Sequence, residues 1–204
     1  MLYVLAGWTG FRKGELGSLT KASFRLDGAP ATVTVAAGYS KRRRTDTQIL
    51  HPEVVDQLKS WLDKKQLAPD QLLFVISERA GGLERDTSKM IQRDLARARE
   101  FWLKEAATDA ERKQRDESEF LRYETRDGLF ADFHSLRHFF ITSLERSGIS
   151  PKMAQTLARH SDIRLTLGVY THVGLHDQTA AIAAMPGPSA LQYDAAALPR
   201  AIAG

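Results

Sequence analysis

The sequence of 204 residues contains no cysteine. This absence excludes a disulfide scaffold, a thiolate zinc site and a cysteine nucleophile, and it fits a reducing compartment. No apolar run approaches the roughly 18 positions that a membrane helix needs, and the first residues lack a basic leader and a small-residue cleavage site. These absences predict a soluble, unexported, cytoplasmic protein that has no membrane partner.

The length and composition are those of an ordinary globular protein. At a typical domain size of roughly 150 residues, the chain is long enough for one domain with appendages. Apolar residues make up 43% of the sequence and charged residues 26%. This balance excludes wholesale disorder and a fibrous repeat, and it predicts a chain that folds around a real core.

The net charge is only +4, which is a weak argument for a polyanionic partner. Its distribution is more informative. Residues 104–127 carry six basic and eight acidic side chains, so the basic excess lies elsewhere and is concentrated in the run Lys41–Arg44. Taken alone, a basic run of this length is more often a solvated loop than a nucleic-acid contact.

The first third of the chain predicts short helices followed by a small sheet. Residues 1–18 form two helical pieces broken at Thr9-Gly10. Segments that are rich in Val, Thr and Phe then predict three antiparallel strands, at residues 22–26, 31–36 and 46–50. The basic run lies on the loop between the last two strands, and Pro52 begins a helix that continues to about Lys65.

The rest of the chain predicts helices and one insertion. A helix runs from a cap among Asp86, Thr87 and Ser88 to about Ala107, and the following helices span 135–147, 151–159 and about 162–170. We expect the buried side of the first of these to contain Met90, Ile91, Leu95, Ala98 and Trp102. The fold class is therefore mainly α with a small three-stranded antiparallel sheet. Residues 1–185 form the domain, with a charged insertion at about 104–130, and residues 186–204 form a flexible tail.

Four segments contain the residue types that suit phosphate chemistry. They are Thr9–Leu16, Ser40–Arg42, His134–His138 and Leu157–His160, the last followed ten residues later by Tyr170. Each residue also has a simpler explanation, because an arginine pairs with a nearby glutamate, a lysine in a basic run is solvated, and a tyrosine packs in the core. These explanations do not account for the joint arrangement and its order along the chain.

Together the four segments resemble the catalytic domain of the tyrosine recombinases, the phage integrase family. The family pattern has an Arg in a TGxRxxEL-like box, a Lys in a β-hairpin, an HxxRH box, a second His in an LGH-like box and a nucleophilic Tyr. The corresponding positions hold Arg12, Lys41, His134, Arg137, His160 and Tyr170. The resemblance covers roughly residues 1–175. Two features depart from it: Arg159 stands where Gly is usual, and the spacer 104–133 is longer.

The resemblance implies a role for each residue, and the chemistry agrees. Tyr170 is the nucleophile, with His134 as its proton acceptor. Arg12, Arg137 and His160 stabilise the charge on the phosphate, with Glu15 as support. Lys41 is the general acid, and Arg42, Arg43 and Arg44 bind DNA. Neither a metal nor another cofactor is implied, because cations take the place of a metal and the sequence has no P-loop.

The expected function is that of a site-specific DNA recombinase or integrase catalytic domain with a covalent 3′-phosphotyrosyl intermediate. Two alternatives remain: DNA relaxation like that of a type IB topoisomerase, and a DNA-binding remnant that does not cut. The expected partners are double-stranded DNA and further copies of the chain, as a tetramer on paired sites in the nucleoid. The family's N-terminal DNA-clamping domain is expected to be absent from this chain, since Arg12 lies close to its start.

Overall fold

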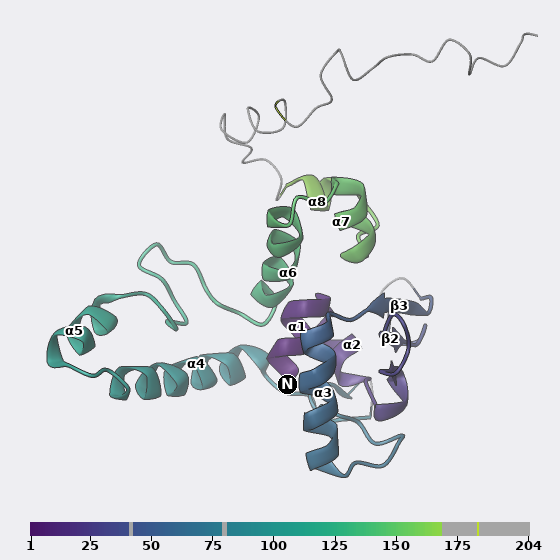
Figure 1. Ribbon diagram of the computed structural model, residues 1–204, viewed down its shortest axis with the longest axis horizontal. Helices are drawn as coiled ribbons and strands as arrows, with labels where there is room; N and C mark the ends of the chain where they lie inside the picture. Colours follow the sequence, from purple (N-terminus) through teal and green to yellow (C-terminus); the bar gives the residue numbers. More distant parts are fainter. Residues whose placement is uncertain (41–42, 79–80, 169–182, 184–204) are drawn as a thin grey trace, which may run out of the picture. The chain divides into compact units, whose positions relative to one another are not determined.

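The computed structural model describes residues 1–40, 43–78, 81–168 and 183 (Figure 1). The chain divides into two units, Met1–Val169 and Tyr170–Gly204, and only the first is described in any detail. In chain order its elements are α1 (Leu2–Thr9), α2 (Lys13–Gly17), η1 (Lys21–Ser23), β1 (Phe24–Arg25), β2 (Thr32–Val35), β3 (Asp46–Ile49), α3 (Pro52–Lys65), α4 (Thr87–Lys104), α5 (Asp109–Glu117), α6 (Ser135–Arg146), α7 (Pro151–Leu157) and α8 (Arg164–Leu167). The predicted class, mainly α with a small sheet, is confirmed.

The three strands form one antiparallel sheet in the order β1-β2-β3. Strand β2 is central, with Thr32 opposite Ile49 and Val35 opposite Asp46. Alternation along the strand buries Val33 and Val35, while the hydroxyl of Thr34 meets that of Thr47 at 3.0 Å on the exposed face. The strands are shorter than the predicted segments, but their positions and pairing agree with the sequence pattern.

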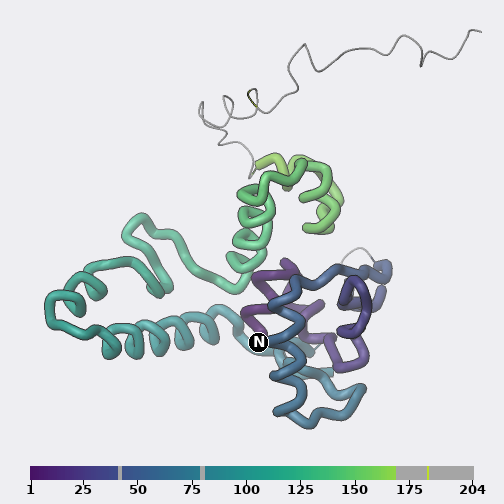
Figure 2. The backbone as a smooth tube through the Cα atoms, in the orientation of Figure 1, coloured from purple at the N-terminus to yellow at the C-terminus, as the bar shows by residue number. Residues whose placement is uncertain are grey.

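The core lies between this sheet and the helices α1, α2 and α3. Its most buried side chains come from segments distant in sequence: Leu5, Leu16, Leu19, Val33 and Leu58. Helix α3 begins at Pro52 as predicted and buries its apolar stripe. The chain then returns toward α2 (Figure 2), where the backbone N–H of Leu73 donates to the carbonyl of Leu19 at 2.8 Å.

Helix α4 departs from the predicted burial pattern. It begins at an Asp86 cap, whose Oδ1 accepts from Ser88 N and Lys89 N at 3.1 Å each, and it ends at Lys104 rather than Ala107. Of the five residues expected on its buried side, only Ile91 is buried, and Ala98 is exposed. Met90, Leu95 and Trp102 are half-buried, and Met90 packs against the core, while α4 also contacts α5; full burial of the expected stripe is therefore wrong.

Arginines that donate to backbone carbonyls hold the charged insertion together. Arg99 Nη2 donates to the carbonyl of Asp116 at 2.7 Å, and Arg126 Nη2 donates to that of Glu117, also at 2.7 Å. Arg115 lies 5.0 Å above the ring of Trp102 and also donates to its carbonyl. The insertion therefore gains order from polar contacts where apolar burial is scarce.

Helix α6 packs along α1 and ends before Gly148, whose φ of 70° permits the turn that leads to α7. Helix α7 starts at Pro151 as predicted, with Ser150 Oγ accepting from Met153 N at 3.3 Å. The last predicted helix, 162–170, is shorter in its described part, because α8 spans only Arg164–Leu167. Within the described ranges no helix is long and apolar enough to cross a membrane.

Gly10 generates a prediction about stability. It has a φ of 61° at the end of α1, and a Cβ there would lie 2.5 Å from Cδ1 of Phe140. Because both the backbone and the contact would be strained, Gly10→Ala should lower the free energy of unfolding by about 3 kcal/mol. Chemical denaturation measures this change.

Gly14→Ala provides the matched control. Gly14 lies inside α2, and a Cβ there would meet nothing within 4 Å. This substitution should be neutral or should stabilise the protein by about 0.5–1 kcal/mol, because alanine has the lower conformational entropy cost in a helix. Equal effects of the two substitutions would contradict the contact between α1 and α6.

Candidate active site

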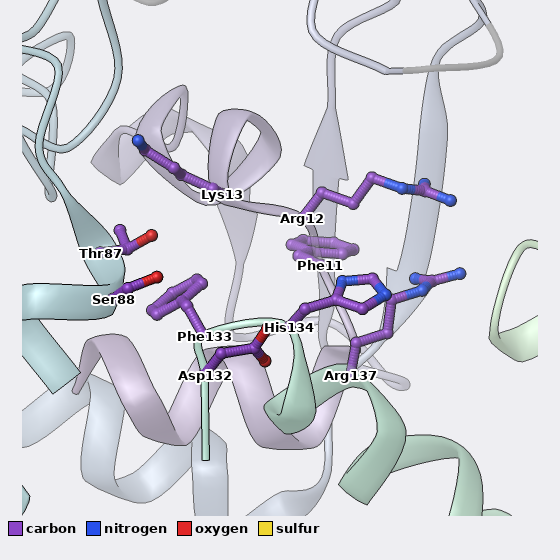
Figure 3. A pocket seen from close by; sticks show the side chains of 9 residues that line it. All are labelled: Phe11, Arg12, Lys13, Thr87, Ser88, Asp132, Phe133, His134 and Arg137. Carbon is purple, nitrogen blue, oxygen red and sulfur yellow. The ribbon is translucent and has the colours of Figure 1, made fainter. Parts of the chain in front are cut away.

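Three segments far apart in the sequence, residues 11–13, 87–88 and 132–137, meet at a cavity of about 320 Å³. The start of α2 provides Arg12, and the start of α6 provides His134 and Arg137. In Figure 3 the side chains of Arg12 and Arg137 extend to the same side with the His134 ring between them, whereas Lys13 extends away. The sequence prediction that these three residues lie together is therefore consistent with the fold.

Arg137 ties its own helix to the segments that precede Arg12 and His160. Its side chain is buried, and its Nη1 and Nη2 donate to the carbonyls of Gly10 and Ala158, respectively. Burial, followed by the charges of Arg12 and Arg159, lowers the pKa of Arg137 to about 10, so the group stays cationic at neutral pH. A guanidinium has five N–H donors, so three remain for an anion.

Glu15 is the carboxylate at the centre of the site, and it is only 2% exposed. Its Oε2 accepts from the backbone N–H of Arg12 at 2.8 Å, while its Oε1 lies 3.5 Å from Arg12 Nη1. Its Oε2 also accepts from Arg159 Nη2 at 3.1 Å. The geometry agrees with the supporting role that the sequence predicts for Glu15, since one carboxylate touches two arginines.

The two histidines are held in their neutral forms. Partial burial, then the charges of His138 and Arg137, lowers the pKa of His134. Burial, then Arg137 and Arg12, lowers the pKa of His160 to about 4. Nδ1 of His160 lies 2.9 Å from the hydroxyl of buried Thr166, so a ligand would contact the other ring nitrogen, Nε2.

Some predicted residues lie outside the described part of the chain. These are Lys41, Arg42, Tyr170, the segment 171–185 apart from residue 183, and the tail 186–204. Arg43 and Arg44 are both exposed, and Arg44 Nε pairs with Asp46 Oδ1 at 3.3 Å. The buried carboxylate of Asp46 also accepts from Ser40 Oγ at 2.7 Å. The carboxylate of Asp46 therefore anchors both ends of the basic loop, and its charge raises the pKa of Arg159.

Sequence reasoning missed Arg159 and Thr166. It treated Arg159 only as a departure at a glycine position, but the side chain is 6% exposed and reaches Glu15. The sequence does contain one signal for Arg159: a charged residue stands at a helix end, where glycine is favoured. Among the described residues no group of three or more side chains that could hold a metal ion occurs.

The fold is that of tyrosine recombinase catalytic domains. The integrase of the Tn1549 transposon, solved with transposon right end DNA, is similar with a TM-score of 0.57 and 18% identity over 89% of this chain and 56% of that chain. The XerA recombinase is similar with a TM-score of 0.53 and 23% identity, over 88% of this chain and 54% of that chain. The catalytic domain of bacteriophage HP1 integrase is similar with a TM-score of 0.51 and 17% identity, over 94% of this chain and 84% of that chain.

The sequence model of the phage integrase family matches residues 1–176. The chain therefore belongs to the phage integrase family. No curated protein matches it. It spans slightly more than half the length of the Tn1549 integrase and XerA chains.

The depressed pKa of His160 predicts a pH dependence of stability. Folded His160 gains its proton only near pH 4, whereas the unfolded residue gains it near roughly pH 6.5. The unfolded chain thus binds more protons between these values, so the free energy of unfolding should fall as the pH drops from about 6.5 to about 4. His160→Asn should reduce that fall by on the order of 1 kcal/mol, allowing for solvent screening of the half-buried ring.

Denaturant unfolding of wild type and variant at several pH values measures this difference. His51→Asn replaces an exposed histidine outside the cavity and serves as the control. It should retain the steep fall of the wild type. If His160→Asn shows the same pH dependence as the wild type, the ring is not held neutral by burial and the neighbouring arginines.

Proposed function

We propose that this chain is the catalytic domain of a site-specific DNA recombinase that cuts and rejoins DNA through a 3′-phosphotyrosyl intermediate. The observation that carries the proposal is the meeting of Arg12, Arg137 and His160 from three distant segments. Like charges repel: beyond the effect of burial, the charges of Arg12 and Arg159 lower the pKa of both Arg137 and His160, and Glu15 is the carboxylate whose charge opposes them at Arg137. Such a cluster favours an anion, and family membership supports a DNA phosphate as that anion.

The proposed reaction exchanges one phosphoester for another. The Tyr170 oxygen forms a bond to phosphorus as the bond to the 5′ oxygen breaks, and the reverse attack by the 5′ hydroxyl rejoins the strand. Arg12 and Arg137 stabilise the charge on the non-bridging oxygens, and His160 donates a hydrogen bond to one of them. Because its pKa is lowered, His134 is unprotonated at neutral pH and can accept the tyrosine proton.

Lys41 would protonate the departing 5′ oxygen. The loop that carries it begins at Ser40, which is bonded to Asp46 beside the arginine cluster. Neighbouring cations lower the pKa of a lysine and make it a better acid. The energy of the broken bond is kept in the phosphotyrosine, so the proposed cycle needs no nucleotide hydrolysis and no cofactor.

The proposed substrate is double-stranded DNA of the nucleoid in the cytoplasm. Solved complexes of related folds contain DNA, including the XerH recombinase bound to its difH substrate. Arg42, Arg43 and Arg44 would contact backbone phosphates, and four copies of the chain would act on paired sites. The insertion at about 104–130 is proposed to be a surface elaboration of this domain.

Tyr170→Phe tests the nucleophile. The substitution removes only a hydroxyl, so DNA affinity should stay within about twofold while the covalent protein–DNA adduct disappears. A nicked suicide substrate traps the adduct, and peptide mapping identifies the modified residue. Tyr123→Phe, which changes another tyrosine of the chain, is the control and should still form the adduct.

Three results would contradict the proposal in different ways. An adduct at another tyrosine would show that the nucleophile is misassigned. No adduct from the wild-type chain, with DNA binding intact, would favour the non-cutting remnant. Relaxation of supercoiled DNA of arbitrary sequence by the protein alone would favour topoisomerase activity.

Lys41→Ala tests the general acid. A substrate with sulfur in place of the departing 5′ oxygen needs little protonation, so it should restore cleavage by Lys41→Ala far more than cleavage by Arg12→Ala. Lys13→Ala is the matched control, because Lys13 Nζ contacts Glu84 and the carbonyl of Arg85 instead. It should cleave the ordinary substrate near the wild-type rate. Equal rescue of Lys41→Ala and Arg12→Ala would show that Lys41 has another role.

A further inference from the structure

The turn after α7 places an arginine where the backbone favours glycine. Two hydrogen bonds close this turn, from His160 N to the carbonyl of Gln155 and from Arg159 N to that of Thr156, both 3.0 Å. This pair is the Schellman arrangement, whose left-handed position is usually glycine. Arg159 occupies that position with a φ of 54°, at a cost of roughly 1–2 kcal/mol for a residue with a Cβ.

The side chain of Arg159 crosses to the segment that carries Arg12. Its Nη2 pairs with Glu15 Oε2 at 3.1 Å, with both side chains buried, and its guanidinium lies 4.3 Å above the ring of Phe11. The same carboxylate reaches the Arg12 guanidinium only at 3.5 Å. Glu15 is thus held more closely by Arg159 than by the Arg12 side chain.

This placement has two further costs. Nε and Nη1 of Arg159 are buried and have no hydrogen-bond partner among the described residues. Burial lowers the pKa of the group, and the charge of Arg12 lowers it further, while Glu15 and Asp46 raise it. A glycine would remove the backbone strain and both of these costs. These costs stand against the buried ion pair with Glu15 and the contact with Phe11, which are the interactions that the arginine adds at this position.

We infer that Arg159 is a positioning residue that neutralises Glu15 and so keeps the Arg12 guanidinium available for the DNA phosphate. Without Arg159, Arg12 is the one cation among the described residues that forms an ion pair with the buried carboxylate of Glu15, and this charge-assisted pair would compete with the phosphate. Arg159 itself stays behind the cavity, stacked on Phe11. This inference rests on the proposed function.

Arg159→Gly tests the inference, because glycine suits the left-handed position and the relief of backbone strain offsets part of the loss of the buried pair with Glu15. With saturating suicide substrate, the single-turnover rate of adduct formation should fall about 10- to 100-fold, while DNA affinity changes less than about threefold. The melting temperature should stay well above the assay temperature, so that the rate is compared between folded proteins. Arg159→Lys, which keeps the charge, should recover part of the rate.

Glu15→Gln combined with Arg159→Gly is the decisive variant. The amide keeps an acceptor for the Arg12 N–H but loses the charge, so the double variant should cleave faster than Arg159→Gly alone. Gln66→Gly is the backbone control, since Gln66 ends α3 with a φ of 46° away from the site. It should raise stability and leave the cleavage rate unchanged.

Several outcomes would overturn the inference. They are cleavage by Arg159→Gly within threefold of wild type, a defect explained by a lower melting temperature, or a double variant slower than Arg159→Gly. If the wild type forms no adduct, the proposed function fails, and the NMR resonance of Arg12 Nε–H decides the inference. That resonance should shift in Arg159→Gly and return in the double variant; an unmoved resonance overturns it.

Discussion

The buried guanidinium of Arg137 is the contact on which the site depends. It bonds the carbonyl of Gly10, just before Arg12, and that of Ala158, two residues before His160. Secondary structure alone does not place these segments together, because they lie 148 residues apart from Arg12 to His160. One side chain thus sets the relative positions of the groups that would meet a phosphate, before any DNA binds.

The site gathers positive charge at an electrostatic cost to the free protein. Arg12, Arg137 and Arg159 share the charge of one central carboxylate, Glu15, and the histidines respond by staying neutral. A pentavalent phosphorus with extra negative charge would relieve this repulsion at the moment of transfer. In the proposed reaction the arrangement would thus be preorganised, and relief of the repulsion present in the free state would stabilise the transition state.

Local signals in the sequence predict most of the fold. Pro52 marks the start of α3, and Val and Thr alternate through β2, so these elements are found where expected. The order of motifs also predicts the meeting of Arg12 with Arg137. The degree of burial of α4 could not be predicted, because the spacing of apolar residues shows which face of a helix is apolar but not which element packs against it. The role of Arg159 was equally hidden, since it depends on a left-handed backbone angle and on Glu15, 144 residues away.

The arginine contacts of the insertion have a consequence for its tolerance of sequence change. Arg99, Arg115, Arg122 and Arg126 each donate to backbone carbonyls, including those of Trp102, Asp116, Glu117 and Ser118. A carbonyl acceptor is present whatever side chain its residue carries. Substitutions at the acceptor positions therefore leave these bonds intact, and only the donors are constrained. The insertion can drift in composition over evolutionary time while its backbone path persists.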